Sequence, residues 1–499
     1  MDEVSRARIR VFLNDPAARG QRPVSTDAPL ETERRPWGFR VEGKAPPARV
    51  YPPDTPEFLY WQIVSALARG RSLWARLLPE AGTWVRGAVL PVVPIEDEGL
   101  NAYYDRKALH FFRDVNATTG EVVQSGDSPD VVTHEQGHAV LDAIRPDLWD
   151  APHFEVAAFH EGFGDIAAIL VALEEPDLAR AAIRETKGSL DHSNLVSRLA
   201  EELAAAVIAR YGPDAALPDS LRDAVNSFHY RSPRSLPDEA PADALSREPH
   251  SFCRVVTGAC WDVLVRLSVA AEEQEQPAAL RAAARKVGAL VATAAEGAAS
   301  GAAFFRRFAA ELIRAAADDE PAGAAVREAL AARGLGGADE DGARDRPEAR
   351  VAAGLGPEPL TTRVLDAVRE RLGASREEEI LVRPSPGGLE GRRPRDLFLF
   401  GPEYGPADGA AVEISDSFTV AVDGGGYVAA SNLETAGPEE EEDAREFVRT
   451  LARRDRIAAD DEAPPNVARL YLEGKSHFVA RESDGVRRVR RAWISGGGR

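Results

Sequence analysis

Cysteine and methionine are nearly absent from this chain. Of its 499 residues, two are cysteines and one, Met1, is a methionine. Cys253 and Cys260 lie in a segment with a helical pattern. There a rise of ~1.5 Å per residue separates them by roughly 10 Å along the axis, too far for a disulfide. Two free thiols are typical of a reducing compartment, so the sequence predicts a cytoplasmic location.

Long apolar runs are also lacking. Residues 1–10 carry acids and arginines and are not followed by an apolar run of the length that a secretory leader needs. No stretch of 18 or more apolar residues occurs, so the sequence predicts no membrane span. The free thiols and the missing leader together favour a cytoplasmic location. Secretion by an unconventional route is the alternative, because it requires no leader.

Positive charge is in deficit. Lys and Arg number 61 against 81 Asp and Glu, which gives a net charge of -20 and a pI of about 5.1. A surface of this charge repels phosphate backbones and anionic lipids, so neither nucleic acid nor a membrane is expected as a partner. The arginine-rich residues 486–491 are a local exception, and a solvated strand or tail accounts for them. The apolar fraction of 44% is that of an ordinary globular protein.

Composition and periodicity divide the chain into five regions. Residues 1–60, rich in Pro and Arg, are predicted to be an irregular lead-in on the surface of the next unit. Residues 61–152 are predicted to form a subdomain with strands and a central helix, and residues 153–335 a mainly helical subdomain. A charged, Gly-containing linker is expected over 336–357, followed by a small α+β domain over 358–499 to which we assign no chemistry.

Several elements inside these regions can be predicted from apolar spacing and turn residues. In the first three regions they are helices over 55–78, 154–173, 185–228, 252–269 and 277–335, a strand over 88–93, and a hairpin joining 101–112 to 121–124. In the C-terminal domain they are helices over 360–372 and 439–453, a strand over 396–400, a hairpin of 412–422 with 427–430, and a final strand pair within 476–494.

The predicted helix over residues 130–142 contains the pattern H-E-x-x-H at His134, Glu135 and His138. Because a helix has ~3.6 residues per turn, the two imidazoles share a face and can reach one ion. Taken alone, the motif also fits a surface helix that happens to carry two histidines. A catalytic zinc ion takes three protein ligands and an open position, so a third ligand is required.

The next predicted helix, residues 154–173, supplies that ligand. Glu161 follows His138 by 23 residues and offers a carboxylate. Asp165, one turn later, can accept the free ring N–H of a ligating histidine. The sequence therefore predicts one catalytic zinc ion held by His134, His138 and Glu161, with Asp165 behind a ligand.

These two helices resemble those of the thermolysin-like zinc metallopeptidases, the gluzincins, in which an H-E-x-x-H helix precedes a helix with E-x-x-x-D. Asp142, four residues after His138, also matches the family pattern. The resemblance extends over roughly residues 88–335. It implies an α+β thermolysin-like core, with a β-containing subdomain that carries the zinc helix and a mainly helical subdomain. Glu135 is then the general base, and Asp142 belongs to the supporting network.

Three further segments resemble the family's substrate-binding parts. Asn101, Ala102 and Tyr103, with Tyr104, resemble the edge strand that pairs with a peptide backbone; for Tyr104 alone, packing in a hairpin core explains the aromatic residue equally well. Arg231 resembles the arginine that holds a substrate carbonyl, although a surface salt bridge would explain it too.

The third segment, residues 249–252, resembles the one whose histidine stabilises the oxyanion, which makes His250 the expected donor; capping of a loop or helix is the alternative. The acidic residue that orients this histidine in the family is out of register here. Glu248 or Asp243 could take its place.

The chain departs from the family pattern at other positions. Trp149 stands where a tyrosine often donates to the oxyanion, and its indole N–H is a donor of different reach. His160 stands where an asparagine is usual. Asp130 matches a calcium ligand, but Ala172 stands where the acidic partner is expected, so the calcium site is incomplete by sequence.

The function that these motifs favour is hydrolysis of internal peptide bonds in a peptide or protein substrate. An aminopeptidase of this type would carry a G-x-M-E-N stretch, which the single methionine Met1 excludes. A non-peptidase zinc hydrolase and a catalytically silent binding scaffold on the same fold remain as alternatives. The sequence carries no indication of cleavage preference or oligomeric state.

Overall fold

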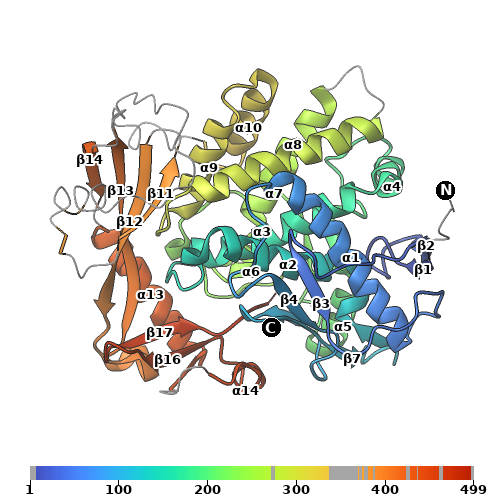
Figure 1. Cartoon of the computed structure of the whole chain (residues 1–499), viewed down its shortest axis with the longest axis horizontal. Coiled ribbons are helices and arrows are strands. Elements are labelled where there is room, and N and C mark those ends of the chain that lie inside the picture. Colours follow the sequence, from blue (N-terminus) through green and yellow to red (C-terminus); the bar gives the residue numbers. More distant parts are fainter. Residues whose placement is uncertain are drawn as a thin grey trace.

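The structure is a computed structural model that describes residues 7–270, 276–336, 369, 374–375, 380–385, 388–422, 428–434, 436–459 and 465–495. Helices and β-sheets both contribute, so the expected mixture of the two is confirmed. In Figure 1 a small sheet with β3 and β4 lies below the helices α2, α3 and α7 to α10, and a second, larger sheet with β11 to β14 stands at the left. The predicted linker over 336–357 and helix over 360–372 lie outside the described residues, except for Gly336 and Arg369.

The small sheet has the strand order β18-β5-β6-β4-β3. Its strands are β3 (Gly38–Val41), β4 (Val89–Val93), β5 (Ala102–Tyr104), β6 (Leu109–Phe111) and β18 (Ile494–Ser495). The predicted strand over 88–93 is confirmed as β4, whose alternate residues Leu90 and Val92 are buried. Strand β5 pairs antiparallel with β6 on one side and with β18 on the other, although β18 comes from the far end of the chain.

The lead-in is more ordered than the sequence suggested. Strands β1 (Arg8–Val11) and β2 (Val24–Asp27) form a hairpin, and β3 joins the small sheet parallel to β4. Ile9, Trp37 and Phe39 are fully buried. The prediction of an irregular surface segment is therefore wrong here, because strands of four residues show too few alternations to stand out among the prolines.

The predicted hairpin over 101–124 is two hairpins. Strand β5 turns into β6 where the Asp105 carboxylate accepts hydrogen bonds from the backbone N–H groups of Lys107 and Ala108. Strand β7 (Arg113–Val115) turns into β8 (Val122–Gln124) where the Asn116 side chain accepts from two following N–H groups. Each turn is made by an Asx side chain, and the first was overlooked because it contains no glycine.

Helices α2 (Pro129–Ile144) and α3 (Phe154–Leu173) pack together at the centre of the molecule, and both predicted helices are confirmed. A Cβ atom on Gly137 would lie 2.9 Å from the Cβ of Ala167 and 3.0 Å from the Cα of Gly164, so glycines permit this close approach. Helix α3 is long and apolar enough to cross a membrane, but its most apolar window is 100% buried inside the structure. That is the environment of a core helix.

The other helices cover this pair. They are α1 (Pro56–Leu77), α4 (Pro176–Thr186), α5 (Glu201–Tyr211), α6 (Pro249–Phe252), α7 (Arg254–Ala270), α8 (Gln276–Gly297), α9 (Phe304–Ala315) and α10 (Glu320–Ala332). The helices predicted over 55–78 and 277–335 are confirmed, and the one over 252–269 is interrupted at Cys253. The predicted helix over 185–228 is wrong: only α5 forms, and β9 (Arg198–Leu199) pairs with β10 (Arg222–Asp223) instead. Gly212 ends α5 with a φ of 95°.

The larger sheet belongs to the C-terminal region. Its strands are β11 (Leu381–Ser385), β12 (Gly388–Phe398), β13 (Ala411–Val422), β14 (Val428–Glu434), β15 (Ile457–Ala458), β16 (His477–Arg481) and β17 (Arg487–Arg491). Helix α13 (Pro438–Arg453) packs on it, and the short α14 (Val467–Leu472) lies between β15 and β16 in the chain. The predicted hairpin, helix and final strand pair of this domain are confirmed, whereas the strand expected over 396–400 begins earlier and ends at Phe398.

Two large hydrophobic clusters hold the chain together. The first contains buried residues from Ile9 to Leu335, and the second contains residues from Leu397 to Val489. Helix α3 belongs to both, since Phe154 and Ala157 at its start pack into the second cluster. Ile494 of β18 packs into the first cluster, so the end of the described chain returns to the helical part.

Candidate metal centre

Helix α2 brings two histidines and a glutamate to the centre of the molecule. His134 and His138 lie one turn apart, with ring centroids 4.6 Å from each other and ring planes at 88°. Their exposed fractions are 3% and 0%, and Glu135 between them is also fully buried. The helical spacing therefore has the effect that the sequence predicted: both rings lie on one face.

Glu161 of α3 completes the group. Its Oε2 atom lies 3.4 Å from His134 Nε2 and 3.8 Å from His138 Nε2. All three ligand atoms lie within 4.8 Å of one another, and within the described part of the chain His138 Nε2 and Glu161 Oε2 make no hydrogen bond. Buried polar atoms without hydrogen bonds are costly. Their convergence is explained if they hold one metal ion, so the residues fit such an ion.

Asp165 lies behind His134, as the sequence predicted. Its Oδ1 atom is 3.1 Å from His134 Nδ1, on the opposite side of the ring from Glu161. Burial alone would raise the pKa of Asp165, but Arg222 and His134 hold it well below its usual range. An ionised Asp165 favours the His134 tautomer with the proton on Nδ1, which leaves the Nε2 lone pair for a metal.

Arg222 is a site residue that the sequence did not reveal. It lies in β10 and binds Asp165 with both Nη2 and Nε, at 2.7 and 2.9 Å. Despite its burial, the Asp165 carboxylate raises its pKa further. Arg231, the arginine chosen from the sequence, is exposed instead. A buried arginine can be predicted from sequence only if its carboxylate partner is known, and the partner of Arg222, Asp165, is 57 residues away in the chain.

Among the described residues, no carboxylate pairs with Nδ1 of His138 as Asp165 does with Nδ1 of His134. Burial and the proximity of His134 lower its pKa well below the ordinary value for histidine. The lowered pKa favours the neutral imidazole, which is the form that binds a metal. His160, whose ring centroid is 6.0 Å from that of His138, is likewise buried and has a lowered pKa.

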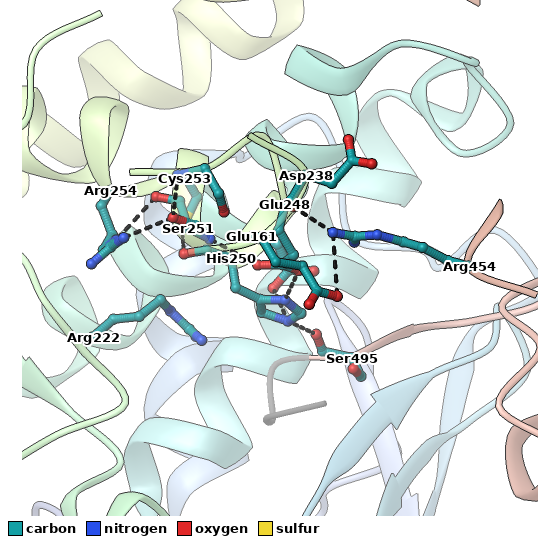
Figure 2. A network of polar contacts seen from close by, with 12 residues as sticks. Glu161, Arg222, Asp238, Glu248, His250, Ser251, Cys253, Arg254, Arg454 and Ser495 are labelled. Atoms are coloured by element: carbon teal, nitrogen blue, oxygen red, sulfur yellow. Dashed lines mark hydrogen bonds and ion pairs between the residues drawn. The ribbon is translucent and has the colours of Figure 1, made fainter. Parts of the chain in front are cut away.

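His250 of α6 lies beside Glu161, with 3.3 Å between Nε2 and Oε2 (Figure 2). Its Nδ1 is 2.7 Å from Glu248, which resolves the choice between Glu248 and the exposed Asp243. Burial would lower the pKa of His250, but Glu161 and Glu248 raise it to about 9. A protonated ring can donate from both nitrogens, and Nε2 donates to the carbonyl oxygen of Ser495 at 2.6 Å.

Asp142 lies at the end of α2 and ties the small sheet to this helix. Its carboxylate accepts hydrogen bonds from Arg106 at 2.6 Å and from the Tyr104 hydroxyl at 3.0 Å. Tyr104 thus has a supporting role on the inner face of β5. Arg106, at the β5–β6 turn, has a φ of 70° and was not found from the sequence.

The other predicted substrate-binding residues lie at the start of β5 and in the segment that follows α2. The Asn101 side chain accepts from the Ala102 N–H at 2.9 Å and hydrogen-bonds the Tyr471 hydroxyl of α14. Burial and the nearby Glu135 contribute to raising the pKa of Tyr471 to about 12. Trp149 does not aim its indole N–H at the metal ligands; it donates to the Arg491 carbonyl at 3.2 Å.

A second acidic cluster lies near the start of α2. Carboxylate atoms of Asp15, Asp130 and Glu201 lie within 4.8 Å of one another, and all three residues are buried. Burial and the charge of Asp15 raise the pKa values of Asp130 and Glu201. The acidic partners of Asp130 in this cluster come from the lead-in and the start of α5, whereas Ala172 of α3 is an apolar core residue.

Comparisons with known proteins add no relative: neither the protein-family models nor the curated proteins contain a match to this chain, so the functional inference rests on the geometry of the site.

Proposed function

We propose that the chain is a zinc-dependent endopeptidase with a thermolysin-like catalytic core. One observation carries the proposal. A backbone carbonyl, that of Ser495, accepts a hydrogen bond from His250 Nε2, and the same nitrogen lies 3.3 Å from the metal-ligand candidate Glu161. A peptide carbonyl thus lies next to the group of residues that could hold a metal, which supports a peptide as the substrate.

The donor set supports zinc as the metal. Two imidazoles and one carboxylate are typical of catalytic zinc sites, and softer thiolate ligands are absent from the cluster in the described residues. When bound, zinc supplies Lewis-acid polarisation of the scissile carbonyl and lowers the pKa of a coordinated water toward ~7.

Glu135 is the general base in this proposal. It is fully buried on α2, follows the metal-ligand candidate His134 in the chain, and is not one of the three residues that could hold the metal. Its carboxylate takes the proton from the attacking water and later delivers it to the leaving amine. Proton transfer by a placed group of this kind contributes ~10²–10⁴-fold to the rate.

His250 is the electrophilic partner. Its Nε2–H donates to the oxygen of the scissile carbonyl as negative charge develops there, and Glu248 at 2.7 Å keeps the ring charged and oriented. Removal of one oxyanion donor typically costs ~10²–10³-fold in kcat. Strand β5 offers the peptide a backbone partner, since an extended chain can add to it as an antiparallel strand.

The proposal is tested by metal analysis and by identification of the fragments released from a mixture of unfolded proteins. The wild type should bind one zinc ion, the chain should release internal fragments when the edge of β5 is free, and a chelator should stop the cleavage. Glu135→Gln should keep the zinc and lose hydrolysis, whereas His138→Ala should lose both. Glu80→Gln, at an exposed position, is the matched control for the amide substitution.

Two outcomes would contradict the proposal. Full hydrolysis by Glu135→Gln would eliminate the proposed base. Bound zinc without cleavage of any peptide bond, in a chain whose cleft is open, would favour a non-peptidase zinc hydrolase or a silent scaffold.

A further inference from the structure

Strand β18 occupies the edge of β5 that a peptide substrate would need. Ile494 pairs with Tyr104 and Ser495 with Tyr103, in the antiparallel direction. Figure 1 shows the red end of the chain leaving β17 and returning to the blue strands of the small sheet. The backbone groups of β5 that face away from β6 are thereby used by the chain itself.

The carbonyl group at the end of β18 lies where a scissile carbonyl is expected. Ser495 O is 2.6 Å from His250 Nε2, and Glu161 Oε2 is 3.3 Å from that nitrogen. Figure 2 shows the Ser495 carbonyl next to the His250 ring, with Glu161 close to the same ring. The bond that follows this carbonyl is Ser495–Gly496, so this is the bond that the segment presents.

The residues before Ser495 are held by several contacts with the segment that follows α2 and with the first hydrophobic cluster. The Arg491 carbonyl accepts from Trp149 Nε1 at 3.2 Å, and the Arg491 N–H donates to Asp150 at 2.8 Å. The exposed fractions of Ile494 and Ser495 are 3% and 7%, and Ile494 packs into the first hydrophobic cluster. The segment is therefore bound by backbone pairing and by a buried side chain, as a substrate strand would be.

Aromatic residues of the C-terminal region close the same cleft from α14. The ring of Tyr471 stacks on Tyr103 at 4.7 Å and on Phe112 at 4.8 Å, and Trp493 lies 5.2 Å from Tyr471. The Tyr471 hydroxyl hydrogen-bonds the Asn101 side chain near Glu135. The start of the edge strand is thus covered by the C-terminal region.

Contacts outside the cleft fix the C-terminal domain in this position. His153 lies 3.0 Å from Asp443, Arg234 donates to the Glu439 carbonyl at 2.8 Å, and Phe154 packs edge-on against Phe447. A strand tethered in this way has an effective concentration on the order of millimolar or more at its binding edge. A peptide from solution has to compete with it.

We propose that the C-terminal domain inhibits the peptidase in cis by laying residues 491–495 into the cleft as a substrate strand, with Ser495–Gly496 as the bond presented. The occupancy follows from the contacts above, whereas the inhibited activity rests on the proposed function. The cleft opens to other peptides only when β18 leaves β5.

Two substitutions in β18 test the proposal in the full chain. Ile494→Asp buries a carboxylate in the first cluster, and Ser495→Pro removes an N–H and places a ring against β5. Leu472→Asp is the matched control, because Leu472 is 66% exposed on the adjacent α14. Each is made in the Glu135→Gln background, so that binding is measured without hydrolysis.

The probe is a fluorescent peptide with the sequence of residues 492–499, titrated in the presence of zinc and followed by fluorescence anisotropy. Both β18 variants should bind it about tenfold tighter or more than the parent, because a cleft that is open for a tenth of the time or less weakens the apparent Kd by that factor. The Leu472→Asp control should bind as the parent does. Thermal melting shows whether each variant is folded. If one β18 variant is unfolded, the affinity of the other β18 variant tests the inference.

Equal affinities for the parent, both β18 variants and the control would overturn the inference. Hydrolysis of the same peptide by chains that retain Glu135 separates the two proposals. Tighter binding to the β18 variants without any hydrolysis keeps the occupied cleft and eliminates the peptidase. Hydrolysis by the wild type as fast as by the variants keeps the peptidase and eliminates the inhibition.

Discussion

Asp165 links a metal-ligand candidate to a buried arginine. It holds His134 Nδ1 at 3.1 Å and Arg222 Nη2 at 2.7 Å, so one carboxylate sets the orientation of a ligand and balances a cation. If asparagine replaced Asp165, its neutral amide would orient the His134 ring less well. It would also remove the negative charge that Asp165 places beside Arg222.

We therefore expect Asp165→Asn to lower the zinc affinity ~10–100-fold, as loss of a carboxylate behind a ligating histidine commonly does. Competition with a fluorescent zinc chelator measures the change. Asp114→Asn is the control. Asp114 also pairs with an arginine, Arg210, at an N–O distance of 2.6 Å, but this pair is not part of the metal centre. A folded Asp165→Asn chain with unchanged zinc affinity would contradict the prediction.

Glu155, at the start of α3, should make stability depend on pH. Its carboxylate accepts from the Tyr230 hydroxyl and the Phe305 N–H, both at 2.7 Å, and burial raises its pKa to about 7. The folded state therefore binds a proton more tightly than the unfolded state, whose glutamate titrates near ~4.3. Stability from this group is fully present below that value and is lost as the pH rises through about 7.

Glu155→Gln cannot titrate, so the stability of the wild type relative to this variant should fall between pH 5 and pH 8. Urea unfolding at several pH values measures the difference, and Glu80→Gln at an exposed position controls for the substitution. A difference that stays constant across this range would show that Glu155 does not titrate as described.

Residues of the metal centre whose relative positions are set by one helix could be predicted from the sequence. Residues that reach the metal centre from distant parts of the chain could not. His134 and His138 stand four residues apart on α2, and Glu161 and Asp165 stand four apart on α3, a spacing that a helix converts directly into a shared face. Arg222, Arg106 and Tyr471 reach the site through turns and chain reversals. The residues next to them in the sequence do not indicate which side chains they contact. Arg231 was therefore chosen in place of Arg222.

At the level of elements, the α2–α3 contact depends on glycine. A Cβ atom on Gly164 would lie 2.6 Å from Cε1 and 2.7 Å from Nδ1 of His134. The ring cannot move aside freely, because its Nδ1 is paired with Asp165 at 3.1 Å.

Gly164→Ala should therefore destabilise the fold, by ~1–3 kcal/mol as overpacking commonly does, and also weaken zinc binding. Gly437→Ala is the control, since no atom lies within 4 Å of its Cβ position. Thermal melting and zinc titration measure the two effects. An alanine at 164 that leaves both unchanged would mean that α2 and α3 can separate without cost.

Long elements were predictable and short ones were not. Helices α1 and α3 show sustained apolar periodicity and matched their predictions. Strands β1, β3, β9 and β10 have two to four residues each, too few for a period to be recognised. The helix predicted over residues 185–228 was wrong for this reason. The apolar residues of this region belong to a short helix and to a two-stranded sheet.

At the scale of the whole molecule, the cluster of Asp15, Asp130 and Glu201 joins three distant segments. Mutual repulsion and burial disfavour three charged carboxylates at this spacing, and a calcium ion with its preference for oxygen ligands would relieve both.

We expect millimolar calcium to raise the Tm of a His138→Ala chain, in which the metal centre lacks a ligand and contributes no shift of its own. The increase should disappear when Asp15→Asn is added. Differential scanning calorimetry measures it, with magnesium for comparison. A Tm that calcium leaves unchanged would show that the three carboxylates are stable without a cation.

Composition predicts properties of the whole molecule without giving its arrangement. The cytoplasmic location and the absence of nucleic-acid and membrane partners stay predictions from thiol content and charge. The way the C-terminal domain docks could not be predicted, because its contacts, such as His153 with Asp443, join residues 290 positions apart.

The small sheet takes one edge strand from the beginning of the chain and the other from its end. Strand β3 begins at Gly38, whereas β18 begins at Ile494. A ribosome makes the chain from the N-terminus, and domains fold as they emerge. The helical part and its metal centre can therefore assemble while β18 is still unmade. During that interval the edge of β5 is open to any extended segment nearby, so the newborn protein and the finished one differ in what they can bind.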